Sequence, residues 1–150
     1  FEKLTVFENL VVAASMGSQK AESEVTDRCA EILVDTGLIE RANALAGGLG
    51  LLQRKRLELA RALATDPKLL LLDEIAGGLT EAECKSLIET IRAIHASGIT
   101  IVWIEHVLHA LNAVVQRLLV LNFGKVVDIG TPEDMMASSA VREIYLGIEV

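Results

Sequence analysis

Four consecutive leucines at positions 69–72, followed by Asp73 and Glu74, constrain the fold of this chain more than any other stretch. An apolar run of this length predicts a strand buried on both faces, as the central strands of parallel sheets are. Ligands of open α/β sheets bind just outside the carboxyl ends of the strands. Two adjacent acids are costly to desolvate there unless a cation meets them, and Mg²⁺ is the usual one. The alternative interpretation is a core strand that ends in a solvated turn with two surface acids.

A second apolar segment, residues 99–104, predicts a partner for this strand. A predicted helix, opened by the capping-box pattern at Thr80 and continuing to about residue 97, separates the two segments. A strand, a crossover helix and a second buried strand form a βαβ unit with parallel pairing and a right-handed connection. Because Glu105 and His106 follow the second strand, we expect them at the same sheet edge as the two acids.

The segment before the two predicted strands is expected to be helical, and the segment after them to contain both helices and strands. Residues 1–65 are expected to be helical, and Thr5 and Glu8 form a capping box at the start. Helices are expected there at about residues 5–16, 21–36 and 51–64. On the other side a short helix to about residue 115 precedes two strands, 117–121 and 125–129, which predict a hairpin. Helices beginning at Thr131 and covering 141–146 complete the chain.

Charge and composition exclude some classes of partner. The net charge is −7, and the one basic cluster, Arg54-Lys55-Arg56, is too short to reverse it, which argues against nucleic acid as a partner. Although 51% of the residues are hydrophobic, no apolar run approaches the ~18 residues that span a bilayer. Cys29 and Cys84 stand alone on apolar helix faces, so we expect buried, reduced thiols.

Five motifs occur in a fixed order and spacing: LTVFENL (4–10), RLELARALA (56–64), DPKLLLLDE (66–74), IVWIEH (101–106) and VREIYLG (141–147). Together they resemble the later part of the ATP-binding subunit of an ABC transporter, most closely those of branched-chain amino acid importers. In that family they match the segment after the Q-loop, the helix behind the signature, the Walker B strand, the switch-histidine strand and the C-terminal tail. The resemblance runs from Leu4 to Gly147.

The resemblance implies an α/β fold that is part of the P-loop NTPase fold of ABC ATPases, with parallel strands, helices and an N-terminal helical subdomain. Residues 1–65 would be the helical subdomain with the signature helix. Residues 66–130 would be the C-terminal half of the RecA-like core, with Walker B and the switch histidine. Residues 131–150 would be a C-terminal helical tail.

The same resemblance implies roles for three residues at the sheet edge. Asp73 would hold Mg²⁺, Glu74 would polarise the water that attacks the γ-phosphate, and His106 would contact the γ-phosphate and couple it to a neighbouring subunit. These residue types suit phosphoryl transfer, which needs positioning and charge stabilisation more than covalent help. The alternatives are a surface acid at Glu74 and a histidine that only caps a loop.

Two registers compete for the signature loop, whose family form is Leu-Ser-Gly-Gly-Gln. Residues 45–49 look closer by composition, whereas spacing to the Walker B strand selects Leu49, Gly50, Leu51, Leu52 and Gln53. The second register would put the loop at the start of the third helix, where backbone N–H groups and the helix dipole attract a phosphate held by the other subunit. Leu51 and Leu52 stand where the family has glycines that permit close backbone approach.

The sequence contains no Gly-x-x-x-x-Gly-Lys-Ser/Thr and no Q-loop. The backbone cradle and lysine that grip nucleotide phosphates are therefore missing from these residues. The resemblance predicts a fragment of a longer subunit whose nucleotide grip lies upstream. We expect these residues alone to bind ATP weakly or not at all and to be inactive, although the parent subunit would be an ATPase.

The resemblance further implies ATP and Mg²⁺ as cofactors, with transmembrane permease subunits and a second ATP-binding subunit as partners. It implies a cytoplasmic protein, peripheral on the inner face of the cell membrane. Two alternatives remain: a non-hydrolytic truncated cassette acting as a binding or regulatory module, and a soluble, non-transport ABC ATPase. The missing cradle favours the first, while the acidic balance and residues 141–147 argue against the second.

Overall fold

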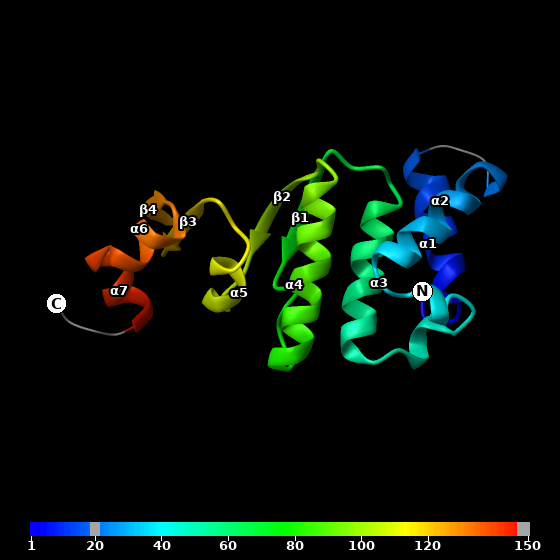
Figure 1. Ribbon diagram of the computed structural model, residues 1–150, viewed down its shortest axis with the longest axis horizontal. Coiled ribbons are helices and arrows are strands. Elements are labelled where there is room, and N and C mark those ends of the chain that lie inside the picture. Colours follow the sequence, from blue (N-terminus) through cyan, green and yellow to red (C-terminus); the bar gives the residue numbers. More distant parts are fainter. Residues whose placement is uncertain (19–21, 147–150) are drawn as a thin grey trace. The chain divides into compact units, whose positions relative to one another are not determined.

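The computed structural model describes residues 1–18 and 22–146, in two compact units, one up to His106 and the other beginning at Val107. The first unit contains α1 (Val6–Ser18), α2 (Glu22–Asp35), the 3₁₀ turns η1 (Ile39–Arg41) and η2 (Ala46–Gly48), α3 (Leu51–Leu63), β1 (Leu69–Asp73), α4 (Glu81–Ala96) and β2 (Thr100–Ile104) (Figure 1). The second contains α5 (Leu108–Asn112), β3 (Leu118–Asn122), β4 (Lys125–Gly130), α6 (Pro132–Ala137) and α7 (Ser139–Leu146). Ala21 and Gly147, which the sequence places in a helix and in the tail motif, lie outside the described residues.

The parallel pairing of the predicted βαβ unit is confirmed, although none of the residues of β2 is fully buried. Strands β1 and β2 pair in parallel, with Leu69 opposite Thr100 and Asp73 opposite Ile104, and α4 connects them (Figure 1). The pairing continues one residue further, because the backbone N–H of Glu74 donates to the carbonyl of Ile104 at 2.9 Å. The carboxyl ends of both strands therefore meet at one edge.

Burial of β1 on both faces, expected from the leucine run, is wrong for these residues. Leu70 and Leu72 are buried, whereas Leu69 and Leu71 are 51% and 70% exposed. Side chains alternate between the two faces of a strand, so one row of leucines points to the covered face and the other does not. The exposed row continues onto β2, and we call this surface the open face: Leu69, Leu71, Val102 and Ile104.

The helices of the first unit share an aliphatic core, whose largest fully buried apolar side chains are Leu10, Ile32, Leu33, Leu38, Leu59, Leu87 and Ile91. The core is built from aliphatic side chains because aromatic residues make up only 3% of the chain. Cys29 and Cys84 are free and buried, as predicted. Among the described residues, no helix is long and apolar enough to cross a membrane.

The predicted helix caps are also confirmed. Thr5 N donates to Glu8 Oε2 at 2.7 Å, and Glu8 N donates to Thr5 Oγ1 at 3.1 Å, which completes the capping box of α1. The hydrogen bonds from Thr5 lower the pKa of Glu8. Thr80 caps α4 and Thr131 caps α6 in the same reciprocal way. Each threonine satisfies a backbone donor that the first helical turn would otherwise leave unpaired.

Helix α2 ends in a tightly packed turn at Gly37. Its φ of +68° lies in the left-handed region, and a Cβ there would be 2.7 Å from Arg56 Nη1. The guanidinium is fixed from the other side, because Arg56 Nη2 donates to Ser86 Oγ at 2.8 Å. Arg56 thus connects α3 with α4 next to the turn, and a Cβ at position 37 would have to displace the end of its guanidinium group.

Replacement of Gly37 by alanine should lower the free energy of unfolding by about 2–3 kcal/mol, because left-handed backbone strain and a clash with Arg56 add. Gly124→Ala is the matched control, since Gly124 has a similar positive φ, +75°, but no atom lies within 4 Å of its added Cβ. The control should show the backbone cost alone. Urea unfolding gives the free energy of unfolding of both variants. An equal decrease in the two variants would show that the clash with Arg56 contributes nothing.

The second unit is built on the predicted hairpin. Strands β3 and β4 are antiparallel, and Phe123 and Gly124 form a two-residue connection with φ values of +45° and +75°. Two consecutive positive φ values match the right-handed twist of the flanking strands. Helix α6 begins with Pro132 at its first position. Helix α5 ends at Asn112, earlier than the predicted residue 115.

Candidate functional site at the carboxyl ends of β1 and β2

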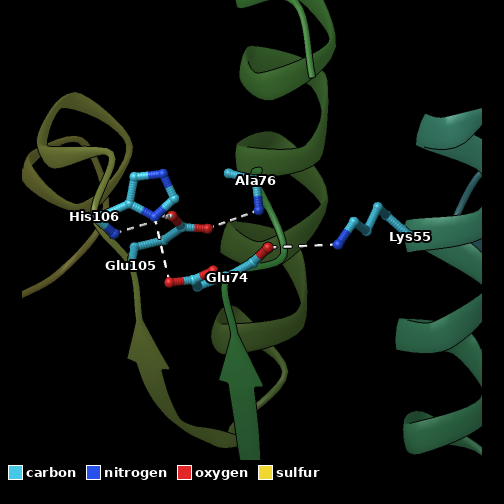
Figure 2. Close-up of polar contacts among 5 residues, drawn as sticks. All are labelled: Lys55, Glu74, Ala76, Glu105 and His106. Atoms are coloured by element: carbon cyan, nitrogen blue, oxygen red, sulfur yellow. Dashed lines mark hydrogen bonds and ion pairs between the residues drawn. The ribbon is translucent and has the colours of Figure 1, made fainter. Parts of the chain in front are cut away.

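The structure brings together two side chains that come from different strands. Glu74 directly follows β1, and His106 lies two residues after β2. His106 Nδ1 is 3.5 Å from Glu74 Oε1, as Figure 2 shows. The two side chains are 66% and 63% exposed, so water and a ligand can reach both.

Glu74 occupies an unusual backbone conformation. Its φ is +45°, in the left-handed region that costs a non-glycine residue about 1–3 kcal/mol and persists only where neighbours hold it. Several contacts hold it here. The Glu74 N–H donates to the carbonyl of Ile104, and the Glu74 carbonyl accepts from the N–H of Gly77 at 3.3 Å. The same carbonyl accepts from Lys55 Nζ at 3.4 Å (Figure 2). Nothing in the sequence pattern signals this conformation.

Glu105 lies beneath this pair with its side chain fully buried. Oε1 accepts a 2.7 Å hydrogen bond from the backbone N–H of Ala76, and Oε2 accepts one of 3.2 Å from the N–H of His106 (Figure 2). Burial raises the pKa of the nearby Cys84 thiol, and the negative charge of Glu105 raises it further. The sequence places Glu105 at this edge without a role; its position beside His106 at a strand end is the only signal.

Asp73 is the last residue of β1 and is exposed at the same edge. Within residues 1–18 and 22–146, no group of three or more His, Cys, Asp or Glu side chains could hold a metal ion by itself. Mg²⁺ at phosphate sites is held by one or two carboxylates together with substrate phosphates, so a single exposed carboxylate suits that mode.

The spacing-selected loop forms the start of α3. Gly50 is the N-cap, and Leu51, Leu52 and Gln53 make up the first turn, with Gln53 Oε1 accepting from Gly50 N at 3.3 Å. The first N–H groups of a helix have no partner within the helix and favour an anion. The competing register at 45–49 instead coincides with η2, which ends before α3 begins.

Two further contacts shape the start of α3. Arg54 reaches back to the preceding loop, where Nε donates to Leu49 O at 3.0 Å and Nη2 donates to Gly47 O at 3.2 Å. Leu51 reaches forward, because its Cδ2 lies 3.2 Å from the point a Cβ of Gly78 would occupy. The start of α3 therefore contacts the turn that follows Glu74.

Comparison with known sequences finds similar proteins that are described as ATP-binding. The family described as ABC transporter matches residues 1–77. The high-affinity branched-chain amino acid transport ATP-binding protein LivG of Salmonella typhimurium is 36% identical, covering 98% of this chain and 64% of LivG. BraF of Pseudomonas aeruginosa, with the same description, is 33% identical at the same coverage. The chain thus spans slightly less than two thirds of the length of these relatives.

Solved structures agree with the sequence comparison. The ADP conformation of an ATP-binding cassette of an ABC transporter gives a TM-score of 0.85 at 25% identity, covering 98% of this chain and 64% of that one. A nucleotide-free ATP-binding cassette from an ABC transporter gives 0.84 at 26% identity with the same coverage. The likeness extends over nearly all of the present chain.

Proposed function

Because this chain belongs to the ABC transporter family, we propose that it is the C-terminal part of an ATP-binding subunit that hydrolyses ATP to drive an importer. One observation carries the proposal. Glu74 and His106 come from consecutive parallel strands and meet at 3.5 Å at the sheet edge where α/β proteins bind ligands. A carboxylate beside an imidazole, both open to water, suits general-base hydrolysis of a phosphate.

In this proposal each residue at the edge has a separate task. The Glu74 carboxylate accepts a proton from the attacking water and orients it. His106 turns Nδ1 toward Glu74, which leaves the opposite ring nitrogen, Nε2, for a γ-phosphate oxygen. Asp73 would hold Mg²⁺, which would supply positive charge to the phosphate oxygens. The strained backbone of Glu74, fixed from α3 and β2, keeps the carboxylate at the edge rather than in the turn.

Residues Leu49 to Gln53 complete the proposed arrangement from another subunit. The first turn of α3 would present its N–H groups to the nucleotide held by a second ATP-binding subunit. Transmembrane permease subunits would be the further partners, and the protein would lie in the cytoplasm against the membrane. The likeness to LivG and BraF supports branched-chain amino acids as the transported class. Residues 1–65, 66–130 and 131–150 would serve as helical subdomain, core half and tail.

The first test compares ATP binding by the 150 residues alone with ATP binding by the chain extended at its N-terminus. The 150 residues alone, which contain no Gly-x-x-x-x-Gly-Lys-Ser/Thr, should show no saturable ATP binding by calorimetry. The same chain preceded by the coding sequence upstream should bind ATP and hydrolyse it with Mg²⁺. Tight binding by the 150 residues would contradict the proposed division, and an extended protein without turnover would overturn the hydrolytic function.

A non-hydrolytic binding module is the second candidate, and Leu51 favours it. Its branched side chain is 46% exposed at the start of α3 and packs against Gly78. A leucine there restricts how closely a phosphate can approach the helix N–H groups. This candidate predicts that the extended protein binds ATP but turns over no faster than its Glu74→Gln variant.

A further inference from the structure

We propose that Glu105 is a positioning residue that fixes Glu74 and His106 relative to each other, an inference that rests on the proposed function. Because its side chain is fully buried, Glu105 acts through these two residues and not directly on a substrate. Its buried carboxylate instead bonds to both segments that carry the reacting groups.

Each oxygen of the carboxylate holds one segment. Oε1 accepts from the N–H of Ala76, two residues after Glu74, at 2.7 Å. Oε2 accepts from the N–H of His106 at 3.2 Å and lies 3.8 Å from Nδ1 of the same ring. Hydrogen bonds to a charged acceptor are shorter and about twice as strong as neutral ones. One carboxylate therefore connects the turn after β1 with His106, which lies just beyond the end of β2.

The burial of Glu105 argues for a specific task. Its side chain is fully buried while Glu74 and His106 beside it are exposed. A carboxylate placed there loses its hydration, and the hydrogen bonds from the backbone N–H groups of Ala76 and His106 offset part of that cost. A leucine or methionine would fill such a space without this cost. An acid at this position can accept hydrogen bonds from both the Ala76 segment and His106, which holds the two segments in a fixed arrangement.

Glutamine tests this arrangement with almost no change of shape. Its amide oxygen can still accept from Ala76 N–H, but its NH₂ group then faces the N–H of His106, so a donor meets a donor. The bond to Ala76 remains while the bond to His106 is lost. Misplacement of a reacting group by about 1 Å can cost about a hundredfold in rate.

The experiment uses the extended protein that carries its phosphate-binding segment. Glu105→Gln should lower kcat about tenfold, while the KM for ATP changes by less than about twofold because the nucleotide grip lies elsewhere. The matched control is Glu8→Gln, which removes a carboxylate that accepts an equally short bond, 2.7 Å from Thr5 N, far from the sheet edge along the chain. The control should leave kcat unchanged. Rates are divided by the number of ATP molecules bound, so that only folded protein is counted.

An unchanged kcat per bound ATP in Glu105→Gln would overturn the proposal. A change in the KM for ATP as large as the change in kcat would overturn it too. If Glu105→Gln does not fold, Glu105→Asp replaces it: the shorter side chain keeps the charge but cannot reach both N–H groups, so kcat should again fall without KM. An unchanged kcat in Glu105→Asp would then overturn the proposal. Failure of the proposed function gives a different result, because wild type and Glu74→Gln would then have equal rates.

Discussion

Glu74→Gln in the extended protein is expected to lower ATP turnover by about 10²–10⁴-fold, the usual contribution of a general base. Glutamine has the same size and can occupy the same place beside His106, but its amide cannot accept a proton from water. ATP affinity should stay close to that of the wild type, because the phosphates are gripped by other residues. Phosphate release under saturating ATP measures the rate, and equilibrium dialysis measures the affinity.

Glu81 provides the control for Glu74. It is an exposed acid in the first turn of α4, a few residues further along the chain. Glu81→Gln makes the same change of charge and should keep turnover close to that of the wild type. If Glu74→Gln also retains turnover, then another group activates the water and the proposed role of Glu74 is wrong.

His106→Ala should lower kcat by about 10²–10³-fold, the cost of removing one group that stabilises charge developing in the transition state. The imidazole lies 3.5 Å from Glu74 and offers its far nitrogen to the phosphate. Alanine removes both the contact with Glu74 and that donor. His95→Ala, which truncates an exposed histidine in the last turn of α4, is the control and should have no effect.

Combining the two substitutions tests whether Glu74 and His106 act together. Groups that work as a unit lose activity non-additively, so the double variant should be little slower than Glu74→Gln alone. Stopped-flow or radiometric assays at saturating ATP can resolve these low rates. Losses that multiply would mean that the two side chains act independently, despite their proximity.

The arrangement of the sheet edge could be predicted because it depends on local pattern and connection rules. Two apolar segments separated by one helix allow little other than parallel pairing, and this places Glu74 and His106 at the same edge. The caps at Thr5, Thr80 and Thr131 follow from short sequence patterns with a direct hydrogen-bonding reason. The structure confirms the strand pairing and each of these caps.

Features that depend on the path of the backbone could not be predicted. Leucines 69–72 form one continuous apolar run, yet their burial alternates, because exposure depends on which elements cover each face. The positive φ of Glu74 arises from contacts with Ile104 and Lys55, which are remote in sequence. The bond from Ala76 to Glu105 joins residues 29 positions apart, and no local pattern indicates it.

The unbroken register of β1 against β2 makes the site sensitive to small changes in chain length. Five consecutive pairs run from Leu69–Thr100 to Asp73–Ile104. Removing one residue within β2 would reverse which side chains point to each face and would bring His106 to the position of Glu105. A deletion in the connection before Thr100 leaves these pairs intact. Single-residue deletions placed before Thr100 should therefore keep the site intact, whereas single-residue deletions after Thr100 within β2 should destroy it.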